Sequence, residues 1–189
     1  MGKAWKIALA GEGGQGVQSV AQILAEAAND QGREALYIPN FGVEQRGGVS
    51  VAYLQIGDTA IGAPKFQTAD IVVALSDRAI HRTKQYAGPE TVYVYDSGIE
   101  GITDEDLPAN AKKVLGIPAL EVAKNELHPR VFNVIIMGAV VKATEVVPED
   151  KVKEAIEKKL GYKFEQNPKL REMNYKAIER GAQLVAEAL

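Results

Sequence analysis

The chain has 189 residues, of which 46% are hydrophobic and 25% charged, and this length is enough for one compact domain with a buried core. It contains no cysteine, which excludes a disulfide framework, a thiolate zinc site, a cysteine nucleophile and an iron–sulfur cluster held by these residues. The formal net charge is -3, and lysines and arginines are scattered among acids, so the composition argues against a nucleic-acid partner.

No segment predicts export or membrane insertion. The apolar run before the first glycine cluster is shorter than the roughly 7–15 residues of a secretory h-region. The longest apolar stretch, residues 134–141, is too short to cross a hydrocarbon core of about 30 Å. We therefore expect a cytoplasmic protein without a membrane partner.

The first part of the chain has the pattern strand, glycine loop, helix, strand. Residues 5–10 are a short apolar run that predicts a strand buried on both faces. Residues 17–28 carry apolar side chains at helical spacing, and Gly32 stands where a cap glycine is expected after the helix. Residues 35–38 predict a second strand, which we expect Pro39 to end.

The middle of the chain continues this alternation. Residues 49–56 predict a strand in a hairpin or at a sheet edge, and residues 70–75 predict a buried strand. Ser76 can cap a helix that runs toward Tyr86, and residues 91–95 predict a further strand. This order of elements predicts an α/β fold with a Rossmann-like, doubly wound, mostly parallel sheet.

The last part of the chain predicts mainly helices. Residues 113–117 are a short strand candidate, whereas residues 131–143 are too long for an ordinary strand and predict a buried helix. Pro148 opens another helix, because proline fits a first helical turn. Residues 168–189 carry apolar side chains at helical spacing with charges between them.

The sequence contains no internal repeat, low-complexity segment or flexible linker. We therefore expect a single domain over residues 1–189. Residues 148–189 form its C-terminal helical part, whose helices pack on the rest.

The strongest local motif is GEGGQG at residues 11–16, a G-x-G-x-x-G between a predicted strand and a predicted helix. Glycines permit a tight turn and let backbone N–H groups approach an anion, and the positive N-terminus of the following helix points at the same place. Val17 and Gln18 follow Gly16 where a P-loop has Lys and then Ser or Thr, so a nucleoside triphosphatase is disfavoured.

Four interpretations of this loop stay open. NAD binding requires an acid near the end of the second strand, where the sequence reads YIPN at residues 37–40, and Glu12 repels phosphate unless it points away. The glycines could instead serve only the close packing of strand and helix. The other two interpretations are an anion or cofactor fragment bound by backbone, and a loop shaped to fit another protein.

A second unusual segment, FGVEQRGG at residues 41–48, follows the second predicted strand. It lies on the same carboxyl edge of the sheet as the first glycine loop, so we expect both loops to face one crevice. Arg46 offers a planar fork to a carboxylate or phosphate, with Glu44 as its neutralising partner. An ion pair within the loop and a ligand contact are both compatible with this pair.

The remaining titratable residues do not assemble a nucleophile, a base and oxyanion donors. His81 and His128 have no ligand or triad spacing and are interpreted as surface or capping residues. Asp96 ends a strand without a partner acid. We therefore expect no catalytic residue and no metal ligand in this chain, which favours a component over a self-sufficient enzyme.

Four segments in order resemble the gamma subunit of 2-oxoacid:ferredoxin (acceptor) oxidoreductases. They are GEGGQG (11–16), NFGVEQRGGVSVAYLQIGD (40–58), ADIVVALS (69–76) and NVIIMGAVVKAT (133–144). The resemblance implies a subunit of a complex that oxidatively decarboxylates a 2-oxoacid, such as pyruvate or 2-oxoglutarate, to its acyl-CoA and passes electrons to ferredoxin or a related acceptor. It implies a Rossmann-like module that covers the active site and assists access of coenzyme A.

The resemblance also implies which cofactors and partners belong to the complex. Thiamine diphosphate and Mg²⁺ are held by alpha and beta subunits, and the iron–sulfur clusters by beta or a ferredoxin-like delta subunit. Consistent with this, Gly57-Asp58 is followed by Thr59 and not by the glycine of a diphosphate–magnesium motif. Transferred to matching positions, the residues of the covering site are Gly11, Gly13, Gly14, Gln15, Gly16, Gly42, Glu44, Arg46, Gly47 and Gly48.

Two other functions remain as alternatives. One is a free-standing dinucleotide-binding oxidoreductase that uses residues 11–16 for pyrophosphate, and the other is a pure interaction module. The identity of the 2-oxoacid and of the electron acceptor does not follow from these residues.

Overall fold

The computed structural model describes residues 2–42 and 48–189. Its strands are β1 Trp5–Gly11, β2 Glu34–Asn40, β3 Ser50–Gly57, β4 Ile71–Ala74, β5 Val92–Asp96 and β6 Lys113–Ile117. Its helices are α1 Val17–Asn29, α2 Asp77–Thr83, α3 Ala119–Glu126, α4 Phe132–Thr144, α5 Glu149–Gln166 and α6 Pro168–Ala188, with 3-10 turns η1 Lys84–Tyr86 and η2 Pro129–Val131.

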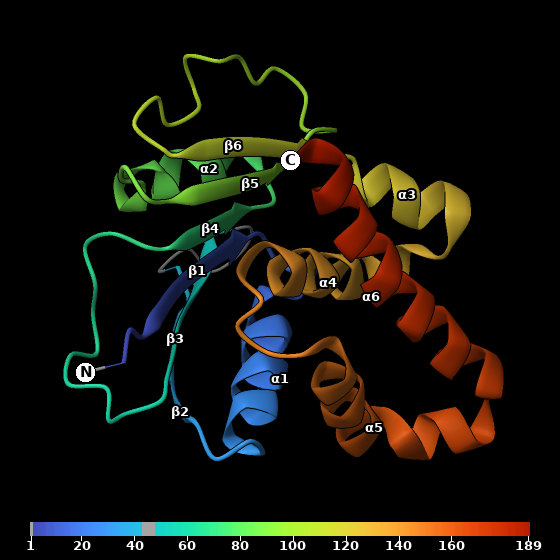
Figure 1. Ribbon diagram of the computed structural model, residues 1–189. Coiled ribbons are helices and arrows are strands. Elements are labelled where there is room, and N and C mark those ends of the chain that lie inside the picture. The colour runs from blue at the N-terminus through green and yellow to red at the C-terminus, as the bar shows by residue number, and fades with distance from the viewer. Residues whose placement is uncertain (1, 43–47) are drawn as a thin grey trace.

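The strands form one sheet in the order β2-β3-β1-β4-β5-β6 (Figure 1). Neighbours among β1, β4, β5 and β6 are parallel, whereas β3 is antiparallel to both β1 and β2. Strand β2 therefore runs in the same direction as β1, and β3 is the one strand that runs the other way in the sheet of the described residues. The α/β fold with a mostly parallel sheet is confirmed, and the observed sheet is mixed.

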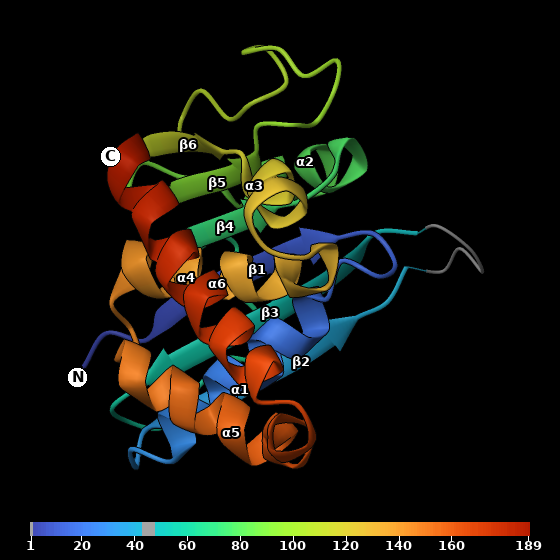
Figure 2. The same ribbon diagram turned by 90° about the vertical axis from the view of Figure 1, so that its right-hand side faces the viewer.

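Helices cover the two faces of this sheet unequally (Figures 1 and 2). Helices α1, α4 and α6 pack on one face, and α5 lies outside them against α1 and α6. On the opposite face the short helix α2 packs over β1 and β4. Side chains of β1 alternate between the two faces of the sheet. Ile7 and Leu9 belong to the core under α1, α4 and α6, and Ala8 and Ala10 belong to the core under α2.

Most predicted elements are confirmed to within a residue or two at their ends, including β1, α1, β4, α4 and the two C-terminal helices. Ser76 caps α2 as predicted, because its hydroxyl accepts a hydrogen bond of 3.1 Å from the N–H of Ala79. Gly32, with φ of 72°, follows α1 in the left-handed conformation that favours glycine at a helix end.

The structure differs from the sequence prediction at three elements. Pro39 does not end the second strand, which continues to Asn40, and the edge position of β2 explains why a residue without an N–H is tolerated there. Strand β3 forms a hairpin with β2 but lies inside the sheet and not at its edge. Helix α3 is absent from the predicted elements although Pro118 and Glu121 mark its start, because its eight residues are too few for a clear periodic pattern.

Helix α6 packs against α4 with close backbone approach. Gly138 of α4 lies against the backbone of Ile178, and Gly181 of α6 lies against the carbonyl of Ile135, so neither position has room for a Cβ atom. Ten of the 13 residues of α4 are buried, which explains why this helix is apolar on nearly every side. Within residues 2–42 and 48–189, no helix is long and apolar enough to cross a membrane.

Candidate functional site

The first glycine loop connects the end of β1 to the start of α1. Gly14 and Gly16 have φ of 86° and 77°, values that side chains rarely adopt, so this bend needs glycine at both positions. A Cβ at Gly16 would also lie 2.8 Å from the Cβ of Asn133 on α4. At Gly13 nothing lies within 4 Å of a Cβ, so that glycine faces open space.

The side chain of Gln15 holds the loop to the sheet. Its Oε1 accepts a hydrogen bond of 2.7 Å from the N–H of Glu12, and its Nε2 donates one of 2.8 Å to the carbonyl of Leu75 at the end of β4. Both ends of the amide are therefore engaged within the protein. Gln15 positions the loop, and the backbone of the glycines is what remains available to a ligand or partner.

Glu12, the acid inside the glycine motif, points toward α2. Its Oε1 lies 2.9 Å from the Nε of Arg78, in an ion pair of two partly exposed side chains. The charge of the carboxylate is thereby balanced within the chain by a residue of α2. This removes the main electrostatic objection to an anion at the loop.

A cavity of about 380 Å³ opens beside this loop, lined by Gly13, Gly14, Gln15, Gly16, Leu120, Pro129, Arg130, Phe132 and Asn133. Its opposite wall comes from α3, η2 and the start of α4. Arg130 is exposed and forms no ion pair with another residue that the structure describes. A guanidinium opposite a helix N-terminus suits an anionic group of a ligand or a carboxylate of a partner.

The second loop leaves the same edge of the sheet, as predicted. In the register of the sheet Gly11 pairs with Ser50, and Asn40 pairs with Val51. Gln18 of α1 links the two regions, because its Nε2 donates hydrogen bonds to the hydroxyl of Ser50 at 2.6 Å and to the carbonyl of Val51 at 3.1 Å. Gly42 and Gly48 flank this loop within the described part of the chain. Glu44, Arg46 and Gly47 lie outside the described residues.

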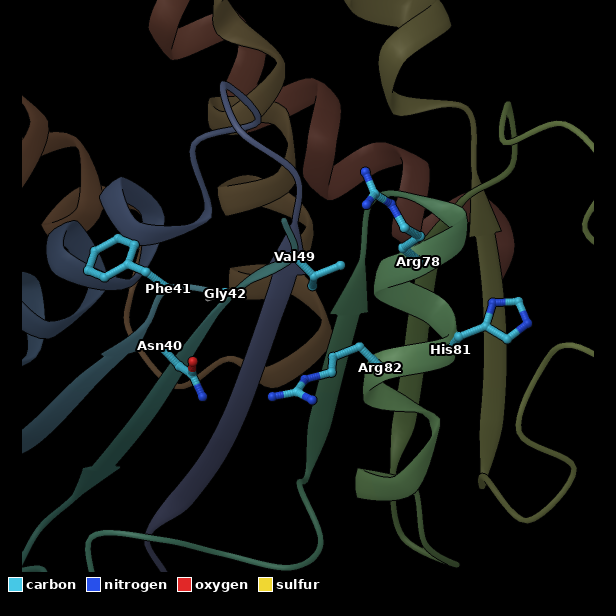
Figure 3. Close-up of a pocket in the computed structure, with 7 residues that line it drawn as sticks. All are labelled: Asn40, Phe41, Gly42, Val49, Arg78, His81 and Arg82. Atoms are coloured by element: carbon cyan, nitrogen blue, oxygen red, sulfur yellow. The ribbon is translucent and has the colours of Figure 1, made fainter. Parts of the chain in front are cut away.

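The described end of this loop lines a different cavity, of about 490 Å³ (Figure 3). It is bounded by Asn40, Phe41, Gly42, Val49, Arg78, His81 and Arg82. The expectation of one shared crevice is therefore wrong for the described residues. The physical reason is that α3, η2 and α4 enclose the first loop, whereas α2 borders the second. Arg78, which lines the second cavity, forms its ion pair with Glu12 of the first loop.

Asp96 holds one wall of the first cavity in place. Its carboxylate accepts hydrogen bonds from the N–H groups of Gly98 at 2.8 Å and Leu120 at 2.9 Å, and only 3% of the residue is exposed. Burial raises the pKa of this carboxyl, which the two N–H donors partly offset. Asp96 therefore holds the start of α3 at the end of β5. Because Leu120 of α3 lines the cavity, Asp96 positions that wall.

The two histidines occupy surface and capping positions, as predicted. Nδ1 of His81 lies 3.0 Å from Oδ1 of Asp77, and hydrogen bonding to the backbone of Asp77 together with the charges of Asp77 and Asp106 raises the His81 pKa. His128 accepts a hydrogen bond of 3.1 Å from the N–H of Arg130 and caps η2.

The cations that surround the two loops are not predicted from the sequence. Arg78 and Arg82 are four residues apart on α2, a spacing that places them on one side of a helix and could have been recognised. Arg130 lies in a segment without a clear periodic pattern, so no local signal placed it opposite residues 13–16. Some of the cations that are scattered in the sequence therefore lie close to the two loops in the fold.

Comparison with known proteins decides the family. The model of the pyruvate ferredoxin/flavodoxin oxidoreductase family matches residues 6–184. The chain belongs to this family. The resemblance drawn from the four sequence segments is confirmed, and the glycine loop, the β2–β3 hairpin, β4 and α4 are the elements that carry it.

Relatives from several organisms agree with this assignment. The ketoisovalerate oxidoreductase subunit VorA of Methanothermobacter thermautotrophicus is 31% identical over 183 residues, which make up 96% of this chain and 36% of that protein. The chain therefore spans about a third of the length of the VorA relatives that it matches. The 2-oxoglutarate synthase subunit KorC of Archaeoglobus fulgidus is 33% identical over 164 residues, covering 86% of this chain and 82% of that one.

Solved structures of similar proteins have the same fold. The 2-oxoglutarate:ferredoxin oxidoreductase from Magnetococcus marinus, solved with 2-oxoglutarate, coenzyme A and succinyl-CoA, superposes with a TM-score of 0.88 at 26% identity, covering 99% of this chain and 32% of that one. The gamma subunit of a keto/oxoacid ferredoxin oxidoreductase from Geobacter sulfurreducens PCA gives a TM-score of 0.81 at 25% identity over 98% of both chains.

Proposed function

We propose that this chain is a gamma-type subunit of a thiamine diphosphate-dependent 2-oxoacid:ferredoxin or acceptor oxidoreductase and is not catalytic alone. The observation that carries the proposal is that both family motif loops leave one edge of the sheet. There the acid of the first loop is neutralised within the chain, and backbone N–H groups and arginines remain to meet an anionic group. Such an edge suits covering a reaction centre that other subunits hold.

The names of the relatives support a proposed reaction for the complex. Those relatives are named for ketoisovalerate, 2-oxoglutarate and pyruvate, which are all 2-oxoacids. The complex would oxidatively decarboxylate a 2-oxoacid to its acyl-CoA and pass the electrons to ferredoxin or a related acceptor. The side chain of the 2-oxoacid would be recognised mainly by other subunits.

The residues of this chain do not suit the complex's own cofactors. Asp58, in the Gly57-Asp58-Thr59 turn, is engaged by Arg33 at 2.8 Å and lies beyond the end of β3 opposite to the two loops. The 189 residues offer no thiolate for an iron–sulfur cluster. Thiamine diphosphate, Mg²⁺ and the clusters are therefore assigned to alpha, beta and, where present, ferredoxin-like delta partners. A cytoplasmic location stays a prediction.

Coenzyme A is the ligand whose chemistry fits the first cavity. It is polyanionic, and the cavity combines the glycine backbone, the N-terminus of α1 and the guanidinium of Arg130. The similar Magnetococcus marinus enzyme was solved with coenzyme A bound. We propose that Gly11, Gly13, Gly14 and Gly16 serve this role through their backbone and that Gln15 positions them, whereas Gly42, Glu44, Arg46, Gly47 and Gly48 of the second loop stay predicted site residues.

The chain's contribution to the reaction is exclusion and positioning. A reactive carbanion-like centre is quenched by water, so a subunit that closes over it improves selectivity without supplying an acid or a base. Gln15 and Asp96 hold the loop and the α3 wall in place, and the backbone of Gly13 stays accessible. Coenzyme A would enter along this wall.

Titration of the assembled complex with coenzyme A tests this role. Gly13→Val fits the protein because a Cβ there meets nothing within 4 Å, and Gly62→Val is a matched control at another open glycine on the 58–70 connection. We expect Gly13→Val to weaken coenzyme A binding by about tenfold or more and Gly62→Val to leave it unchanged. Equal binding by the wild type and Gly13→Val would contradict the assignment.

The strand–loop–helix geometry of residues 11–16 also favours a second candidate, a free-standing dinucleotide-binding oxidoreductase. Co-purification from the native cell and titration of the lone chain with NADH separate the two. The subunit proposal predicts recovery of thiamine- and cluster-bearing proteins and no tight NADH complex. Tight NADH binding by the lone chain, without such partners, would favour the alternative.

A further inference from the structure

An aromatic surface lies on the face of the sheet that α2 covers only in part. A cavity of about 480 Å³ lies between β2, β3, residues 64–66 and η1. Its floor contains Tyr53, Phe66 and Tyr86, and Phe41, Arg82 and Lys65 lie along its border. We call these six residues the β2–β3 surface. It adjoins the cavity of Figure 3, because Asn40, Phe41 and Arg82 line both.

The floor of this surface is ordered by ring contacts. Tyr53, Phe66 and Tyr86 pack edge to face, with ring centroids 5.6 to 6.3 Å apart. The hydroxyls of Tyr53 and Tyr86 are hydrogen-bonded at 2.7 Å. A preformed aromatic floor loses little side-chain entropy when a partner covers it, a property shared by binding hot spots.

Phe41 is the most exposed large apolar side chain that the structure describes. It is 69% exposed, followed by Tyr162 and Leu189 at 60% each. An exposed phenylalanine beside two cavities and at the start of a family motif loop marks an interaction surface more strongly than an isolated apolar residue does. Tyr162 lies on α5, away from this surface, and provides a natural comparison.

The charge of the border indicates the chemistry of the partner. Most other arginines that the structure describes form ion pairs with acids: Arg33, Arg78, Arg171 and Arg180. Arg82 and Lys65 form none with a described residue. The side chain of Arg82 extends from α2 toward Asn40, between the two cavities (Figure 3). A carboxylate on a partner would complete this arrangement.

We infer that the β2–β3 surface docks a segment of the thiamine-holding partner subunit that presents an apolar side chain and at least one Asp or Glu. The apolar side chain would pack on Phe41 and the tyrosine pair, and the acid would meet Arg82. The inference rests on the proposed function. It is supported by the charge of Arg82 and Lys65, which form no ion pair with a described residue, and by continuity with residues 40–58, which carry the second family motif and include β3.

Site-specific photo-crosslinking in the assembled complex is the first test. We would replace Phe41 by the photoreactive residue p-benzoylphenylalanine and, as the matched control, replace Tyr162 in the same way. The inference predicts a crosslink from position 41 to a partner peptide that contains an acid, and none from position 162. Crosslinks from position 41 only to a second copy of this chain would overturn it, and so would crosslinking confined to position 162.

Charge reversal is the second test, and its readout is the dissociation constant of this chain for the partner subunits. We expect Arg82→Glu and Phe41→Ser each to weaken assembly at least about tenfold, with Lys169→Glu and Tyr162→Ser as controls that leave it unchanged. The loss caused by Arg82→Glu should shrink at high salt, because screening weakens the new repulsion. Circular dichroism of each variant establishes that the fold is intact.

The outcomes separate this inference from the proposed function. If the wild-type chain binds no thiamine-bearing partner, the proposed function fails and the docking inference fails with it. If the wild type assembles and the Arg82 and Phe41 variants assemble equally well, the docking inference alone is overturned. If those variants assemble normally but lose coenzyme A binding, the surface holds a nucleotide and not a partner segment, which also overturns the inference.

Discussion

The two faces of the sheet differ in how completely they are closed. On the face of α1, α4 and α6, large side chains such as Ile7, Leu9 and Ile135 are fully buried in one continuous core. On the face of α2 the core is smaller and contains several alanines, and Tyr53, Phe66 and Tyr86 are only partly buried beside two cavities. The closed face supplies stability, and the open face carries the β2–β3 surface that we propose for docking.

Under the proposed function, this difference explains how the chain can serve a reaction centre that other subunits hold. The loops at the edge of the sheet need a rigid base, which the closed face provides through α1 and α4. The open face would be costly in a monomer that stayed alone, because it leaves aromatic surface in contact with water. Substitutions on each face test this difference. Their expected effects on the free energy of unfolding range from about 3 kcal/mol to about 0.5 kcal/mol or less.

The largest effect is expected at the α4–α6 contact of the closed face. A Cβ at Gly181 would overlap the carbonyl of Ile135, so Gly181→Ala must separate the two helices. We expect the free energy of unfolding to fall by about 3 kcal/mol or more. Urea denaturation followed by circular dichroism measures it.

Gly161→Ala on α5 is the matched control, because a Cβ there meets only the side chain of Glu157 at 3.6 Å. Alanine favours the helix over glycine, so this variant should be more stable by about 0.5–1 kcal/mol. Equal stability of the two variants would show that α4 and α6 can separate at little cost. It would contradict the claim that their close contact stabilises the closed face.

A smaller loss of stability is expected at Asp96, whose carboxylate holds the start of α3. Asp96→Asn retains one carbonyl oxygen but replaces the other acceptor by an NH₂ group, so it cannot accept in the same way from both Gly98 and Leu120. We expect a loss of about 1–3 kcal/mol in the free energy of unfolding. The exposed Asp104→Asn should change it by less than about 0.5 kcal/mol. Hydrogen exchange should reveal faster opening of α3 in the Asp96 variant alone.

On the open face, removing the hydroxyl of Tyr53 tests whether the tyrosine pair is preformed. Tyr53→Phe loses the hydrogen bond to Tyr86 but keeps the ring contacts, so we expect a loss of about 0.5–1.5 kcal/mol. Tyr162→Phe, at an exposed position on α5, should be neutral. The thermal midpoint of unfolding measures the effect. An unchanged midpoint in Tyr53→Phe would show that the tyrosine pair does not order this surface.

The smallest effect concerns the pH dependence contributed by His81. Hydrogen bonding to Asp77 and the charges of Asp77 and Asp106 raise its pKa above the ordinary value of 6.5. The stabilising contribution is therefore fully present below about pH 6.5 and is lost as the pH rises through the raised pKa. The side chain is exposed, so we expect about 0.5 kcal/mol or less. His81→Gln should remove this slope from stability curves measured between about pH 5 and 9, and an unchanged slope would contradict the assignment.

Local pattern is sufficient to predict most of the fold. Residues of β4 and α4 are apolar because they are buried on nearly every side, and that burial leaves a direct signal in the sequence. The position of β3 between β2 and β1 depends on pairing across the sheet, which no local pattern encodes. The expectation that Pro39 ends a strand fails for the same reason, since its tolerance depends on β2 being an edge strand.

The site can be predicted only in part. The rule that strand ends share an edge correctly brings residues 11–16 and the ends of the second loop together. The separation into two cavities depends on α3 and on the ion pair between Glu12 and Arg78, which are 66 residues apart. The spacing of Arg78 and Arg82 is recognisable as helical but does not place them beside the second loop, and no local pattern places Arg130 opposite residues 13–16.

The most direct test of the central claim is a reconstitution of turnover. The chain alone, the partner subunits alone and their mixture would each be supplied with a 2-oxoacid, coenzyme A and ferredoxin, and reduction of the acceptor would be followed. The account predicts no turnover by the chain alone, little by the partners alone and full activity when the chain is added in stoichiometric amount. Turnover of a 2-oxoacid by this chain without any partner would contradict it.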